Sequence, residues 1–236
     1  SIPVAFEVIR KPTQFCDLKT RQVKRVSEVT KNELLRDMFT TCVQNSLKFR
    51  YVLLDSWFTS VDNFECIRSK DKHFIGALKD NRLIALTQED KKNGRFVPVD
   101  SLTLLDRQAV RGFLKGYEPE VLLVRRVFTN KDGVESLLNL VCSDLGCNGN
   151  EVAALYKRRW KVEEFHKSLK SNAALAKSPT RRIATQKNHV FASICAVFKL
   201  EILKIKHRMN HFALRTKLLL KATQQAYFQL QKLQAA

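Results

Sequence analysis

The 236-residue sequence has too few acidic residues to balance its basic ones. Against 42 Lys and Arg it carries only 23 Asp and Glu, which gives a net charge of +19. Such an excess predicts a polyanionic partner, nucleic acid before a membrane surface, because phosphates attract many distributed cations. The alternative is a basic protein that has no such partner.

Patterns typical of other protein classes are also missing. None of the six cysteines belongs to a Cys-x-x-Cys pair, and no histidine spacing completes a zinc pattern. Most cysteines lie among apolar residues, as Cys195 does, so we expect reduced, buried thiols of an intracellular protein. No apolar run approaches the length of a membrane span, and no signal-peptide pattern opens the chain. A hydrophobic content of 44% supports a packed core, in one sizeable domain or a domain with an insertion.

The first third of the chain predicts alternating strands and helices. We expect strands at 4–9, 51–54 and 73–78, helices at 30–46 and 61–68, and a polar loop over 13–29. Thr30 and Glu33 form a candidate capping box at the start of the first helix. This order indicates a mostly parallel sheet with helices on its faces.

The pattern changes after residue 81. Residues 82–100 are polar and irregular, and three strands follow at 108–114, 121–129 and 135–143, separated by Gly116 and by a turn at 130–133. These strands predict an antiparallel meander. From Asn150 onward the chain reads as helix: one long helix to about residue 172, a linker containing 178–182, and helices at 186–208 and 213–233. There is no internal repeat.

Four polar residues follow one another at helical spacing in the first of those helices. On a continuous helix Tyr156, Arg159, Glu163 and Lys170 share a face about 60° wide. An apolar stripe borders that face, formed by Leu155, Val162, Leu169 and Ala173. A polar face beside a buried one favours the wall of a cleft that binds an anionic ligand. The alternative is a solvated helix face on which Arg159 and Glu163 form an ordinary pair.

Asp55 ends the fully apolar run at 51–54. The carboxyl ends of buried parallel strands are where open α/β sheets place their sites, although a turn or helix-capping Asp is the alternative. Together with Glu163 it could form part of a carboxylate site for Mg²⁺, since two-metal phosphoryl transfer needs converging carboxylates. Tyr156, Arg159 and Lys170 would then hold a phosphodiester backbone beside the metal ions.

These motifs carry a family resemblance. The spacing Tyr156-x-x-Arg159-x-x-x-Glu163-x-x-x-x-x-x-Lys170 resembles the Y-R-E-K signature of bacterial insertion-sequence DDE transposases. The segment Tyr-Val-Leu-Leu-Asp-Ser-Trp-Phe at 51–58 is similar to their strand that carries the second catalytic Asp. The resemblance covers residues 1 to about 210. It implies an α/β, ribonuclease H-like mixed sheet with helices on both faces, an antiparallel β insertion before the helix that carries the catalytic Glu, and a helical C-terminus.

The resemblance also assigns roles. It implies that Asp55 and Glu163 are metal-binding catalytic acids and that Tyr156, Arg159 and Lys170 contact DNA. It implies a two-ion site for Mg²⁺ or Mn²⁺ and no organic cofactor. The partners would be double-stranded DNA, at transposon ends and at the target, and a second copy in a homodimer on that DNA, with no membrane involved. The location would be the bacterial cytoplasm, in association with the nucleoid.

The domain organisation follows the same resemblance. We expect the first part of the catalytic core at 1–81, the β-strand insertion at 82–147, the second part of the core at 148–210 and a C-terminal helix at 211–236. One departure stands out: no acid ends an apolar strand upstream of Asp55, since Asp17 lies in a basic loop and Asp37 in an amphipathic helix. We therefore expect an N-terminally truncated chain that lacks the first catalytic Asp and cleaves DNA poorly.

Two other functions stay open at this point. One is a catalytically inactive fragment that only binds DNA or poisons a dimer. The other is a ribonuclease H-like nuclease unrelated to transposition.

Several further side chains have two readings each. Trp57 and Phe58 are expected in the core, and Trp160 either packs or stacks on an unpaired base. His166 is expected to pack or to support the site rather than to catalyse. A set of basic residues in the insertion would either lie against DNA or serve solubility: Arg107, Arg111, Lys115, Arg125 and Arg126. The basic segment 177–187 either follows a phosphate backbone or is a solvated linker.

Overall fold

The computed structural model describes residues 3–129, 132–178 and 182–234. The chain divides into two compact units, Ile9–Arg159 and a unit that joins Ser1–Val8 with Trp160–Ala236. Parts of the expected turn at 130–133 and of the expected linker at 178–182 fall outside the described residues. Among the described helices, none combines the length and the apolar character that a membrane crossing requires.

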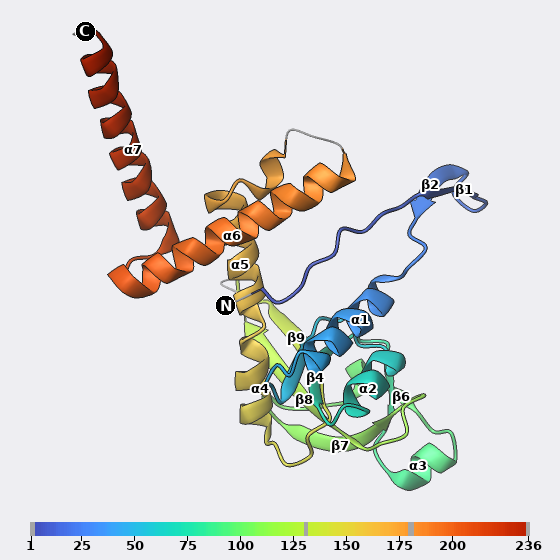
Figure 1. The fold of residues 1–236 in the computed structure, drawn as a ribbon. Helices are drawn as coiled ribbons and strands as arrows, with labels where there is room; N and C mark the ends of the chain where they lie inside the picture. The colour runs from blue at the N-terminus through green and yellow to red at the C-terminus, as the bar shows by residue number, and fades with distance from the viewer. Residues whose placement is uncertain (1–2, 130–131, 179–181, 235–236) are drawn as a thin grey trace. The chain divides into compact units, whose positions relative to one another are not determined.

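The Ile9–Arg159 unit contains nine strands and four α-helices among its described residues (Figure 1). The strands are β1 (Thr13–Asp17), β2 (Gln22–Val26), β3 (Tyr51–Leu54), β4 (His73–Leu78), β5 (Leu83–Ala85), β6 (Val97–Pro98), β7 (Ala109–Leu114), β8 (Val121–Thr129) and β9 (Glu135–Cys142). The helices are α1 (Lys31–Gln44), α2 (Val61–Arg68), α3 (Gln88–Lys92) and α4 (Gly149–Lys157), with a short 3₁₀ turn at Val99–Ser101.

Seven of these strands form one mixed sheet, in the order β3-β4-β9-β8-β7-β5-β6. Only β3 and β4 run parallel among the described strands, with Leu54 opposite Gly76. β9 pairs antiparallel with β4, which places Ile75 opposite Cys142, and β8 and β7 continue the antiparallel meander. The predicted meander is confirmed. The expectation of a mostly parallel sheet is wrong, because the meander strands extend the same sheet in alternating directions.

Both faces of the sheet are covered by helices, and the side chains of β4 show how. Phe74 and Leu78 face a core that includes Phe39 of α1 and Phe64 of α2. Ile75 and Ala77 alternate to the other face, against α4. This period of two is what a strand buried on both sides produces. The mixed α/β fold with helices on both faces is confirmed, and it is consistent with a ribonuclease H-like architecture.

The elements that position Asp55 match their predictions closely. The capping box of α1 is present in both directions: the Glu33 N–H donates to Thr30 Oγ1, and the Thr30 N–H donates to the Glu33 carboxylate. β3, α2 and β4 have the predicted bounds. Apolar periodicity and caps therefore sufficed for this part of the chain.

The beginning of the chain differs from expectation. Residues 3–12 form no strand, and residues 13–26 form the β1–β2 hairpin in place of a loop, with Thr13 opposite Val26. The carboxylate of Asp17 accepts the N–H groups of Lys19 and Thr20 and so closes the turn. The hairpin pairs only with itself among the described strands. Its exposed polar residues lack the alternation of a half-buried strand, which is why the sequence reads as a loop.

The cysteines follow the expectation only in part. All six are free thiols, but only Cys142 is fully buried, and Cys16 on β1 is exposed. Cys16 lies on the hairpin that the sequence analysis read as a loop, and no core covers that hairpin.

The second unit contains α5 (Trp160–Asn172), a 3₁₀ turn (Leu175–Lys177), α6 (Ile183–His207) and α7 (His211–Gln234). The helical C-terminus is thus confirmed. Ser193, Val197 and Leu200 are the fully buried residues of α6 in the described chain. Leu214 is the corresponding residue of α7, whose remaining side chains are mostly exposed.

The expectation of one continuous helix from residue 150 to 172 is wrong. α4 ends at Lys157 and α5 begins at Trp160. Between them the N–H of Arg158 bonds to Leu155 O and the N–H of Arg159 bonds to Tyr156 O, three residues back rather than four. Lys157, Arg158 and Arg159 are consecutive cations, and the helix dipole favours cations at a helix C-terminus. The shared polar face assumes an unbroken helix, and the structure interrupts that helix at residues 158 and 159.

Candidate active site at the end of β3

Asp55 is presented by a tight turn directly after β3. The N–H of Phe58 donates to Asp55 O at 2.8 Å, and the N–H of Ser56 donates to the Asp55 carboxylate at 2.6 Å. Phe58 is partly buried against the core and anchors the turn. The carboxylate is left 48% exposed, which makes it accessible to a ligand.

Tyr156 reaches the same place from α4. It is buried with Val152, one helical turn earlier, against the sheet face that carries Ala77. Its hydroxyl donates to Leu54 O, the last carbonyl of β3, at 3.2 Å. Burial, assisted by the negative charge of Asp55, raises the pKa of this hydroxyl. The hydroxyl therefore stays protonated and ties α4 to the end of β3.

Arg159 completes the group from the turn after α4. Its Nη1 lies 3.6 Å from Oδ2 of Asp55, and its guanidinium carbon lies 5.7 Å from the centroid of the Tyr156 ring. The Arg159 side chain is 21% exposed. The structure thus brings together three of the five residues that the sequence analysis selected, Asp55, Tyr156 and Arg159, in a single compact unit.

These side chains line a cavity of about 380 Å³. The full lining is Asp55, Ser56, Ala77, Leu78, Lys79, Asp80, Leu138, Tyr156 and Arg159. Lys79 and Asp80 were not among the residues predicted from the sequence. They follow β4 as Asp55 follows β3, and the carboxyl ends of parallel neighbours meet at one edge of a sheet. That rule could have found them.

The donor chemistry of this cavity suits a hard cation in kind. Asp55 and Asp80 supply carboxylate oxygens, which Mg²⁺ and Mn²⁺ prefer. Within residues 3–129, 132–178 and 182–234, however, no three His, Cys, Asp or Glu side chains gather closely enough to hold a metal ion.

Glu163 and Lys170 lie on α5, in the second compact unit. Both are exposed there. Their meeting with Asp55 stays a prediction. Along α5, Leu169 is buried as the apolar stripe requires, whereas Val162 is 47% exposed and His166 is also exposed.

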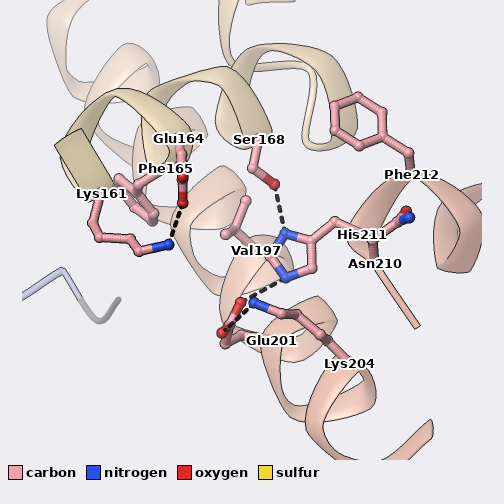
Figure 2. Close-up of a pocket in the computed structure, with 10 residues that line it drawn as sticks. All are labelled: Lys161, Glu164, Phe165, Ser168, Val197, Glu201, Lys204, Asn210, His211 and Phe212. Atoms are coloured by element: carbon pink, nitrogen blue, oxygen red, sulfur yellow. Dashed lines mark hydrogen bonds and ion pairs between the residues drawn. The ribbon is translucent and has the colours of Figure 1, made fainter. Parts of the chain in front are cut away.

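A second cavity, of about 420 Å³, lies within the second unit (Figure 2). There His211 stands between two partners: its Nδ1 lies 2.8 Å from Oγ of Ser168, and its Nε2 lies 2.7 Å from Oε2 of Glu201. Glu201 also pairs with Lys204 at 3.0 Å. The order of groups superficially matches a Ser-His-acid triad.

The surroundings of Ser168 argue against a nucleophile. Ser168 lies in the middle of α5. The backbone N–H groups around it donate to carbonyls of the preceding helical turn, so they are not free to bind an oxyanion. Its Oγ also accepts a hydrogen bond from Asn172. The group therefore joins α5, α6 and the first residue of α7, and we assign it a structural role.

Another acid is buried at the opposite end of β3. The Asp144 carboxylate accepts hydrogen bonds from Arg50 and from the Tyr51 hydroxyl, both at 2.7 Å, and from the Gly146 N–H at 3.1 Å. Burial acts to raise the pKa of Asp144, but the hydrogen bonds from Tyr51 and Gly146 and the charges of His73 and Arg50 together lower it. Asp144 is fully engaged and lies away from the Asp55 cavity, so we place it outside the candidate site.

Arg125 departs from its expected role in the insertion. It is 4% exposed, and its guanidinium donates to Asn139 Oδ1 at 3.0 Å, to Val99 O at 2.9 Å and to Leu102 O. Arg125 therefore ties β8 to the preceding loop and is not available to DNA. Its neighbour Arg126 pairs with Asp106 at 3.0 Å.

The sequence model of the family described as transposase DDE domain matches residues 8–199 of this chain. The chain belongs to the transposase DDE domain family. The matched range contains the Asp55 cavity and continues through Glu163 and Lys170. A search of curated proteins returned no match.

Membership in the transposase DDE domain family gives the chain its broad role. It is a transposase-type protein that processes nucleic acid, with DNA as its partner, and the family generally uses divalent metal ions. The strongly basic composition agrees with a DNA partner.

Proposed function

We propose that this chain carries out metal-dependent DNA strand cleavage and strand transfer at the ends of an insertion sequence, as a homodimer on duplex DNA. The observation that carries the proposal is the placement of Arg159 beside Asp55 at the carboxyl end of β3. A cation next to an accessible acid suits a phosphodiester that must be held while it is attacked.

Asp55 and Glu163 would hold Mg²⁺ or Mn²⁺. Bound divalent ions activate a water or a 3′-hydroxyl and stabilise the leaving oxygen. The side chains of this chain would bind and position the DNA. Arg159 and Lys170 bind phosphate oxygens, and Tyr156 holds the end of β3 in place through Leu54 O.

The test is DNA cleavage with matched acid variants. Supercoiled plasmid that carries the flanking inverted repeats is incubated with the chain and Mg²⁺ or Mn²⁺, and nicked product is measured. We expect Asp55→Asn and Glu163→Gln to abolish nicking, while Glu164→Gln, on the next residue of α5, retains it. Metal-dependent nicking that survives in Glu163→Gln would contradict the proposal.

The runner-up is a DNA-binding fragment without catalysis. The small number of acids around Asp55 favours it among the described residues. DNA binding by the unmodified chain with no nicking under any metal condition would decide for this alternative. Nicking that does not depend on the inverted repeats would indicate a nuclease instead.

A further inference from the structure

Trp57 carries one of only two indole rings in the chain, and it is 73% exposed. It lies two residues after Asp55, and the expectation that it belongs to the core is wrong. Phe58 occupies the core side of the turn, so Trp57 is directed outward. Tryptophan is usually well buried, but a single exposed apolar side chain is common and decides nothing alone.

A second observation gives this exposure a meaning. The Nζ of Lys79 lies 4.9 Å from the centroid of the Trp57 ring. Lys79 follows β4 and also lines the Asp55 cavity. An indole face and an ammonium group thus stand together beside the acid of the candidate site.

The turn that carries Trp57 is held firmly. The Phe58 N–H bonds to Asp55 O at 2.8 Å, and the Thr59 hydroxyl donates to Ser56 O at 3.0 Å. The indole ring and the Asp55 carboxylate are therefore presented by one short, hydrogen-bonded segment. Lys79, which contacts the ring and lines the cavity, connects the two.

The chemistry of the surroundings selects the ligand class. Asp55, Ser56, Lys79 and Asp80 of the cavity lining are polar or charged, and the neighbouring apolar residues Ala77 and Leu78 are buried, so the exposed ring is no part of a broad apolar patch for a protein partner. A nucleotide offers both a flat base for the indole and a phosphate for the ammonium.

We propose that Trp57 stacks on an unpaired base of the DNA strand whose phosphodiester lies at Asp55, and that Lys79 binds a phosphate next to that base. The inference rests on the proposed function, because it takes DNA at the Asp55 cavity as given. Stacking would keep a base out of the duplex and so fix the backbone at the site.

The presence of only two tryptophans allows a direct test. In the variant Trp160→Phe, Trp57 is the single fluorescent indole. Labelled DNA is titrated, either as a blunt duplex or as the same duplex with a single-stranded fork, and anisotropy reports binding in the same cuvette. We expect the forked DNA to quench Trp57 strongly and the blunt duplex to quench it little. The reverse variant, Trp57→Phe, should show a small change from Trp160 on both.

Affinity supplies the second measurement. Trp57→Ala should bind forked DNA roughly 5- to 100-fold more weakly, the range measured for base–aromatic contacts, and blunt duplex within about twofold. Trp57→Phe should retain most of the affinity. Leu105→Ala, which removes another highly exposed apolar side chain, is the control and should change neither.

Two results would overturn the inference while leaving the proposed function intact. One is tight binding of forked DNA with Trp57 unquenched; the other is an equal loss of affinity for both DNAs in Trp57→Ala. If the unmodified chain bound neither DNA, the proposed function would fail, and this inference with it.

Discussion

The Arg159 guanidinium lies 3.6 Å from the carboxylate of Asp55, although 104 positions separate the two residues in sequence. β3 presents the carboxylate of Asp55, and the turn after α4 presents the guanidinium of Arg159. α4 can do so because Tyr156 fastens it to Leu54 O, the carbonyl that immediately precedes Asp55. The pair thus depends on packing across the sheet.

Arg159 should contribute to DNA affinity more than its neighbour Arg158 does. Both carry one charge in the same turn, but only Arg159 lines the Asp55 cavity. Arg159→Ala should reduce the slope of log K against log salt by about 1, as expected for one lost phosphate contact. Salt titrations of DNA binding measure this slope. Equal losses in Arg159→Ala and Arg158→Ala would point to general charge attraction instead.

Arg125→Ala should destabilise the fold. The substitution leaves the carbonyls of Val99 and Leu102 without their buried donor, and we expect a loss of about 2–4 kcal/mol in the free energy of unfolding. Urea unfolding gives the value. Arg111→Ala, on an exposed side chain of β7, is the control and should change stability by less than about 0.5 kcal/mol.

Gly149→Ala should also destabilise, for a steric reason. A Cβ at this first residue of α4 would lie 1.9 Å from Arg107 O, a backbone atom that cannot move aside cheaply. Overpacking of this kind costs about 1–3 kcal/mol. Asn150→Ala, one residue later and exposed, provides the comparison in thermal unfolding. If Gly149→Ala unfolded at the same temperature as Asn150→Ala, the close approach of α4 to Arg107 would be disproved.

Asp144 should make stability depend on pH in acid. Because its folded pKa is lowered, its contribution is complete above the ordinary Asp value, at about pH 5 and higher, and disappears as pH falls through the folded pKa. Asp144→Asn should therefore be less stable at pH 7, by about 1–3 kcal/mol, and lose less stability between about pH 5 and 2. Urea midpoints across this range test it. Asp37→Asn, exposed on α1, should keep the unmodified profile.

Local patterns predicted the part of the fold that holds Asp55. The apolar run before Asp55 predicted β3, and the capping box at Thr30 predicted the start of α1. In the meander, turn residues between apolar runs predicted β7, β8 and β9. What local patterns could not give was the direction of pairing: nothing in the residues of β9 states that it runs antiparallel beside β4. Arg125 shows the same limit, because a buried guanidinium differs from an exposed one only in which distant carbonyls meet it.

The candidate site was predictable in composition and only partly in arrangement. Asp55 was selected as the acid that ends an apolar strand, and Tyr156 and Arg159 were selected for a shared helix face. They meet at the end of β3, with Arg159 in the turn after α4 rather than on a continuous helix. Helical periodicity assumes an unbroken backbone, and the three-residue hydrogen bonds at Arg158 and Arg159 end that assumption. Asp80 and Lys79 carry no local motif of their own, and the rule that parallel neighbours end at one edge of a sheet is the signal that points to them.

The pairing of β9 with β4 bears on how such a protein could be dissected. A deletion of residues 82–147 as one cassette would remove the strand beside β4 and expose its row of backbone donors and acceptors. Open edges of that kind recruit other chains. The segment before α4 is thus bound into the sheet, and shortening it at its outermost strands, β5 and β6, would leave the edge of β4 covered.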